Sequence, residues 1–162
     1  MAKEKVYLDS TIPSYRVGSI SRDLIIAARQ ELTAEWWEKE RRNYELYGSF
    51  VLLEEIEDGN RTFAELRLNL IKELIILDNK PEIEEIAKKY MKHFNFPDKL
   101  FRDMYHVAFA VGYKMDYLLT WNFTHLANVE IEKQLEKLNR KLGFEMPRIC
   151  TPEELRKLKI KR

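Results

Sequence analysis

The feature that most constrains the fold is an alternation of short apolar runs with longer amphipathic stretches along the whole chain. The runs are too short for helices, and the stretches between them repeat their apolar residues at helical spacing. This alternation predicts an α/β fold in which helices cover a mostly parallel sheet. The predicted strands cover residues 6–8, 47–50, 75–77, 117–121 and 148–150.

Helix-start and helix-stop residues stand at the ends of the amphipathic stretches. Ser21 is a suitable N-cap for a long helix, and Thr62 with Glu65 has the spacing of a capping box. Gly143 is a suitable stop for the helix before the last strand. Further helices are predicted at Pro13, through Glu55 to Gly59, and from Pro81, Pro97 and Thr151.

The length and composition indicate one folded domain. The chain has 162 residues, of which 45% are hydrophobic, which is enough for one substantial core. Neither a repeat nor a linker divides it, so we expect a single domain over residues 1–162, with 145–162 as a short C-terminal strand and helix extension.

Charge and cysteine content exclude several classes. The 28 basic and 27 acidic residues give a net charge of +1, so any basic surface must be local. The single cysteine, Cys150, excludes a disulfide framework and a cysteine-based zinc site within one chain. Neither a signal-peptide run nor a membrane span of about 20 apolar residues is present, and we expect a cytoplasmic protein.

Asp9 directly follows the first predicted strand. In open α/β sheets, ligands bind at the carboxyl ends of the strands, so a charged residue at this point is a candidate site residue. The alternative is a helix N-cap, because Asp caps well and a short helix is predicted next.

Asp103 lies just before the most apolar helical stretch of the chain, residues 104–111. Such a helix is buried, and a buried carboxylate needs a cation, a metal or several donors. The alternative to a site role is a buried salt bridge to an Arg or Lys. His106 is one helical turn away, and we expect it to be a hydrogen-bonded core histidine rather than a metal ligand.

Three further residues join these candidates. Helical spacing puts Glu55 on the inward side of its helix, with Glu54, Glu57 and Asp58 toward solvent. Asn122 stands after the clearest strand as either an N-cap or a site residue, and Thr120 can lend a hydroxyl to the same edge. Carboxylates that converge without histidine or cysteine form a hard-oxygen site that suits Mg²⁺ or Mn²⁺ and phosphoryl chemistry.

The sequence resembles the PIN-domain proteins, and within them the VapC-like toxins of type II toxin–antitoxin pairs. The resemblance covers essentially the whole chain. It rests on the order and spacing of residues 6–15, 21–28, 51–59, 103–110, 116–128 and 149–155.

The resemblance implies a Rossmann-like three-layer fold with strand order 3-2-1-4-5 and an acidic pocket that binds Mg²⁺ or Mn²⁺ and cleaves RNA. The family's first three acids fall on Asp9, Glu55 and Asp103. Its fourth acid falls on Asn122, which can ligate a metal but carries no charge. The resemblance also implies an antitoxin partner and a homodimer.

On this basis we expect Asp9 and Asp103 to bind the metal, and Glu55 to complete the shell or orient an attacking water. Asn122 and Thr120 would position the water or the phosphate. The cations expected to bind RNA, by chain position, are Arg16, Arg22 and Lys99, with the basic tail 156–162 as a further candidate or a solvated end.

Three alternatives stay open. One is a catalytically weak or inactive RNA- or protein-binding module of the same fold, which the uncharged Asn122 favours. A second is a DNA-directed nuclease of this fold. A third is a phosphatase with Asp9 as nucleophile, although the second acid that such enzymes need two residues on is Thr11 here.

Overall fold

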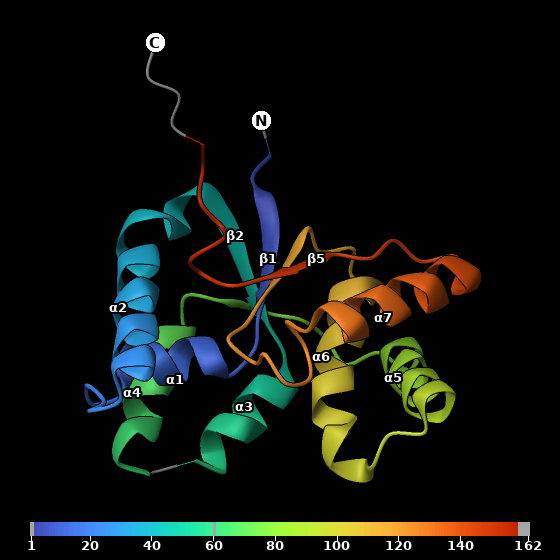
Figure 1. Cartoon of the computed structure of the whole chain (residues 1–162), viewed down its shortest axis with the longest axis horizontal. Coiled ribbons are helices and arrows are strands. Elements are labelled where there is room, and N and C mark those ends of the chain that lie inside the picture. The colour runs from blue at the N-terminus through green and yellow to red at the C-terminus, as the bar shows by residue number, and fades with distance from the viewer. Residues whose placement is uncertain (1, 60, 159–162) are drawn as a thin grey trace.

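A five-stranded parallel sheet forms the centre of the computed structural model, which describes residues 2–59 and 61–158. Its strand order is β3-β2-β1-β4-β5, so the predicted α/β class and order are confirmed (Figure 1). The strands are β1 (Glu4–Leu8), β2 (Tyr44–Gly48), β3 (Ile75–Ile76), β4 (Tyr117–Leu119) and β5 (Arg148–Cys150).

Helices cover both faces of the sheet (Figure 1). Those of one layer are α1 (Thr11–Val17), α2 (Leu24–Lys39) and α4 (Arg61–Ile71). Those of the other are α5 (Pro81–Phe94), α6 (Phe101–Gly112) and α7 (Val129–Leu142), and α3 (Phe50–Glu57) follows β2. Short 3-10 turns cover Arg41–Asn43 and Asp98–Leu100. None of the described helices has the length and apolar character needed to cross a membrane.

Alternate strand residues belong to two separate cores, as the pleat of a strand requires. Tyr7 and Leu118 pack with residues of α5, α6 and α7. Val6, Leu8 and Leu119 pack with residues of α1, α2, α3 and α4. The eight consecutive residues 104–111 of α6 are all buried, as their apolar sequence predicts.

Several predicted boundaries are wrong. The second strand is Tyr44–Gly48 rather than 47–50, because Ser49 already caps α3 by accepting from the Val51 N–H. The N-cap of α2 is Asp23, whose carboxylate accepts from two backbone N–H groups, and Ser21 instead accepts from the Asp23 N–H. Thr62 lies inside α4, which begins at Arg61, so it is not the cap of that helix.

The segment that begins at Thr151 forms one turn and no helix. Glu154 accepts from the Thr151 N–H at 3.0 Å, which is one of the two hydrogen bonds of a capping box. The chain leaves this turn at Leu155, whose carbonyl accepts from the buried Trp36 indole N–H at 2.8 Å. Residues 159–162 of the basic tail lie outside the described residues, and Lys157 pairs with Glu4 at 2.8 Å.

Candidate active site

The carboxyl ends of β1 and β4 meet at one edge of the sheet, because the two strands are parallel neighbours. Asp9 follows β1 and is 3% exposed. One carboxylate oxygen accepts from the Thr11 N–H at 3.0 Å, and the other accepts from the Thr120 hydroxyl. Asp9 therefore holds the start of α1 through Thr11 and faces the end of β4 at the same time. The predicted N-cap role is wrong by one residue, because Ser10 occupies the N-cap position of α1.

Burial raises the pKa of Asp9 to about 6, although the charge of His106 and the hydroxyls of Thr11 and Thr120 oppose the rise. Neither Lys nor Arg forms an ion pair with Asp9 in the parts of the chain that the structure describes. The buried carboxylate therefore lacks a full countercharge.

Glu55 reaches the same edge from α3. One carboxylate oxygen accepts from the Ser10 hydroxyl at 3.2 Å, and the other is hydrogen-bonded to Nε2 of His106. Burial favours the neutral acid, but the hydrogen bond and charge of His106 outweigh it and lower the pKa of Glu55. The predicted inward orientation of Glu55 agrees with these contacts, and its neighbours Glu54 and Asp58 pair outside with Arg102.

His106 is the hydrogen-bonded core histidine that the sequence predicts. Its Nδ1 lies 2.6 Å from the Tyr7 hydroxyl, which lies 2.7 Å from the Ser49 hydroxyl. Burial alone lowers the pKa of His106, but the hydrogen bond and charge of Glu55 and the charges of Asp9 and Asp103 raise it overall. A buried chain of three side chains, Ser49, Tyr7 and His106, thus anchors Glu55.

Asp103 lies in the first turn of α6 and contacts the loop after β4. Its carboxylate accepts from Nδ2 of Asn122 at 3.3 Å and lies 3.0 Å from Nδ1 of His125. The expected alternative, a buried salt bridge to Arg or Lys, is wrong because His125 takes that place. Burial raises the pKa of Asp103, against the opposing charges of His106 and His125.

Thr120 and Asn122 join these groups into one network. The Thr120 hydroxyl accepts from the Asn122 N–H at 2.9 Å and donates to Asp9. The Asn122 carboxamide oxygen accepts from the His125 N–H at 3.0 Å, so this side chain both caps a turn and contacts Asp103. All five predicted site residues therefore lie in the same region.

Sequence reasoning missed His125 as a partner of Asp103. The available signal was its position three residues after Asn122, which is the reach of a residue in one turn. The contact of Asp103 with residues about twenty positions further on comes from tertiary packing, which helical periodicity does not reveal.

The oxygen-rich donor set fits a hard divalent cation, since it offers the carboxylate of the buried Asp9 and that of the partly buried Asp103. Across residues 2–59 and 61–158, however, no three His, Cys, Asp or Glu side chains are already arranged around a common point that could hold a metal. Asp9, Glu55 and Asp103 each direct oxygens to hydroxyl, imidazole or amide neighbours. Metal binding would require some of these side chains to turn.

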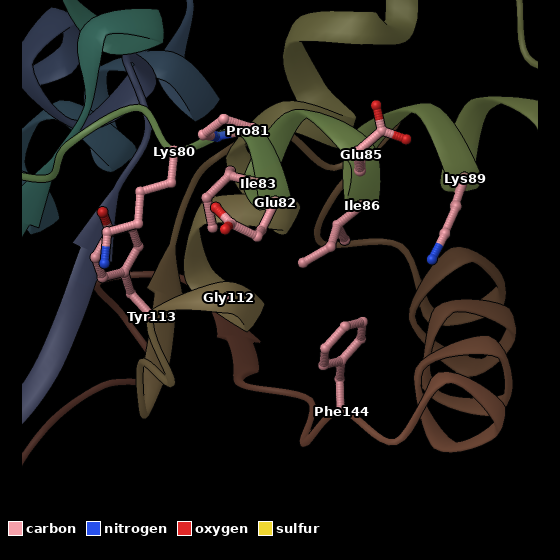
Figure 2. A pocket seen from close by; sticks show the side chains of 10 residues that line it. All are labelled: Lys80, Pro81, Glu82, Ile83, Glu85, Ile86, Lys89, Gly112, Tyr113 and Phe144. Carbon is pink, nitrogen blue, oxygen red and sulfur yellow. The ribbon is translucent and has the colours of Figure 1, made fainter.

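A separate pocket of about 640 Å³ lies beside the start of α5 and the end of α6 (Figure 2). Its lining includes Lys80, Ile83, Gly112, Tyr113 and Phe144, and none of the site acids. Gly112 ends the helix that leads to the beginning of β4, whereas Asp9 and Asn122 follow the ends of their strands. The pocket is thus distinct from the candidate site.

The basic residues that we expected to bind RNA are at least partly exposed, but none of them contacts the site acids in the described part of the chain. Arg16 forms a long ion pair with Glu38 at 3.5 Å and is 31% exposed, and Arg22 and Lys99 are exposed. Charge at these positions is therefore open to solvent, but no described contact links it to the acids.

No family model matches the sequence, and no curated protein matches it. Solved structures do match. VapBC-1 from nontypeable Haemophilus influenzae has 16% identity and a TM-score of 0.56, over 92% of this chain and 98% of that one. VapBC2 from Rickettsia felis, solved with a promoter DNA fragment, has 12% identity and a TM-score of 0.56, over 90% and 97%.

A third match is VapC20 of Mycobacterium tuberculosis, described as a toxin that cleaves the sarcin–ricin loop. It has 11% identity and a TM-score of 0.58, over 74% of this chain and 92% of that one. At these identities the similarity shows the fold, and the chain therefore has the PIN-like fold of the VapC structures.

Proposed function

We propose that this protein is a Mg²⁺- or Mn²⁺-dependent endoribonuclease and the toxin of a toxin–antitoxin pair. The observation that carries the proposal is the convergence of Asp9, Glu55 and Asp103 at the carboxyl edge of a parallel sheet. The shared fold with VapC structures, one of which is described as an RNA-cleaving toxin, supports the same activity. An adjacent antitoxin protein, a homodimer and a cytoplasmic location are parts of this proposal.

In the proposed site, Asp9 and Asp103 would hold the cation, and Glu55 would complete its shell or orient an attacking water. A bound divalent cation supplies an activated water and neutralises charge on the phosphate oxygens. His106 and Ser10 hold Glu55 in place from two sides. Thr120 and Asn122 position the acids, through the hydrogen bonds of Thr120 to Asp9 and of Asn122 to Asp103.

A second candidate function is a catalytically weak RNA- or protein-binding module of the same fold. Two observations favour it: the uncharged Asn122 where the resemblance implies a fourth acid, and the absence of a ready three-ligand cluster among the described residues. Calorimetry with Mn²⁺ separates the nuclease from the binding module, because a binding module is expected to bind no Mn²⁺ at millimolar concentration.

The deciding experiment compares the wild-type protein with Asp9→Asn on a panel of single-stranded RNA, structured RNA and DNA, with Mn²⁺ or with a chelator. We expect RNA cleavage that needs metal and is lost in Asp9→Asn. The matched control is Asp116→Asn, at the opposite end of β4, where the side chain accepts from the Lys5 N–H at 2.8 Å and an amide oxygen can do the same. Equal RNA cleavage by wild type and Asp9→Asn would refute the assignment of Asp9 to the active site. Preferred cleavage of DNA would indicate a DNA-directed nuclease of the same fold.

A further inference from the structure

An exposed aromatic ring stands beside the candidate site. Phe123 follows Asn122 directly and is 41% exposed, so part of its ring is open to solvent beside the network of site residues. The guanidinium of Arg29, on α2, lies over the Phe123 ring at 4.6 Å from its centroid. The ring is therefore held on one side by a cation and open on another.

Several contacts hold the neighbours of Phe123 in place. Trp121 lies 6.1 Å from it, centroid to centroid, and is fixed by an indole N–H bond to the Thr33 hydroxyl at 2.7 Å. The same guanidinium of Arg29 lies 5.8 Å from the Trp121 centroid. An aromatic surface that is already ordered loses little conformational entropy when a ligand stacks on it.

A hollow of about 430 Å³ adjoins this surface. Phe123, Trp121 and Arg29 line one part of it, and Leu24 and Ile25 of α2 line another. Glu153 also lines the hollow and would repel phosphate, so a nucleic acid backbone would lie on the Arg29 side. The hollow combines a flat π-face with one local cation, which are the two elements of single-strand recognition.

We propose that this surface stacks an unpaired nucleobase of the RNA substrate next to the phosphate to be cleaved at the acidic site. The inference rests on the proposed function and adds how the substrate is recognised. Phe123 supplies the stacking face and Arg29 the countercharge for a neighbouring phosphate. Phe123 directly follows Asn122, which contacts Asp103. This arrangement selects single-stranded or looped RNA over a duplex, in which the bases are already stacked.

The test is binding of a short unstructured RNA in the presence of EDTA, so that neither cleavage nor metal enters the measurement. We expect Phe123→Ala to weaken binding by about 5-fold to 100-fold, the range of one lost base–aromatic stack. Phe123→Tyr keeps the π-face and should bind as wild type does. The matched control is Val129→Ala, which truncates another exposed apolar side chain, 80% exposed, outside the hollow.

A series of RNAs, each with one abasic position, supplies the second arm. At one position the abasic RNA should bind wild type as weakly as intact RNA binds Phe123→Ala, with little further loss when both changes are combined. Equal affinity of wild type and Phe123→Ala for RNA would overturn the inference. RNA binding that depends on Phe123 without any cleavage in Mn²⁺ would refute the nuclease and leave the stacking site intact.

Discussion

Asn122 donates a hydrogen bond from Nδ2 to Oδ1 of Asp103 over 3.3 Å, while its carboxamide oxygen accepts from the His125 N–H at 3.0 Å. Both ends of the carboxamide are thus in use. A neutral donor stands beside the partly buried Asp103 at the position where the family resemblance implies a fourth carboxylate. In the absence of metal, the neutral Asn122 spares Asp103 a repulsive contact with a second carboxylate. When metal is present, the site has one charged ligand fewer.

Asn122→Asp is expected to reverse this balance. Without metal it should lower the free energy of unfolding by about 1–2 kcal/mol, because Asp103 loses a donor and gains a like charge. In Mn²⁺ the added carboxylate should strengthen binding at least about threefold, since ligand charge tunes affinity. Urea unfolding and calorimetry measure the two effects.

Asn128→Asp is the control for the change at position 122, because Asn128 caps α7 with its side-chain oxygen and an aspartate caps equally well. It should change neither quantity. Unchanged Mn²⁺ affinity in Asn122→Asp would show that position 122 does not face the cation.

Asp9→Asn is expected to stabilise the protein at neutral pH while abolishing cleavage. The folded protein binds the Asp9 proton more tightly than the unfolded chain, with a pKa of about 6 against 3.8. The free energy of unfolding therefore falls as the pH rises through this window, and the cost is complete above pH 6. Asparagine removes the charge, and we expect a gain of about 1–3 kcal/mol at pH 7.

The gain should shrink as the pH falls toward 4, because the wild-type carboxyl is then protonated in the folded protein and only partly ionised in the unfolded chain. Chemical unfolding of both proteins at several pH values measures it. Asp23→Asn, at the exposed N-cap of α2, should show no comparable gain. Lower stability of Asp9→Asn at pH 7 would contradict the charge-burial argument.

Tyr7→Phe tests the buried chain that anchors Glu55. It removes the hydroxyl between His106 and Ser49 and should cost about 1–2 kcal/mol of stability. It should also weaken Mn²⁺ binding several-fold, because groups behind a ligand set its orientation.

Tyr90→Phe is the matched control for Tyr7→Phe. It removes a buried hydroxyl that donates to Asn139 on the α5–α7 side and should cost similar stability with no change in metal affinity. If both variants change Mn²⁺ binding equally, the hydrogen-bonded chain through Tyr7 contributes only to stability and does not orient Glu55 for the cation.

The sequence predicts much of the architecture because it is written in local patterns. The apolar run before Asp9 is short and therefore predicts a strand. The stretch 104–111 is apolar on nearly every side and therefore predicts a buried helix. The carboxyl-edge position of Asp9 follows from strand direction alone. Grouping it with Glu55 and Asp103 needed the family resemblance, since helical spacing leaves each of them with an ordinary alternative.

The remaining features depend on contacts between distant segments. Tyr7 and His106 are 99 positions apart, and neither periodicity nor capping chemistry relates them. Thr151 has a strong helix-start pattern, yet the chain uses it for a single turn because the following residues pack along the sheet, where Leu155 meets Trp36. Tertiary packing overrides local propensity at such points.

The affinity for Mn²⁺ is expected to depend steeply on pH around the pKa of Asp9. A ligand must lose its proton before it binds, so affinity should fall about tenfold per pH unit below about 6 and level off above it. Calorimetry between pH 5 and 7.5 in a non-coordinating buffer measures this. The Asp9→Asn variant should bind Mn²⁺ more weakly at every pH. Its affinity should also depend less steeply on pH, because the proton of Asp9 no longer competes with the cation. A wild-type affinity that is constant across the window would mean that Asp9 does not bind the cation, whatever its role in the fold.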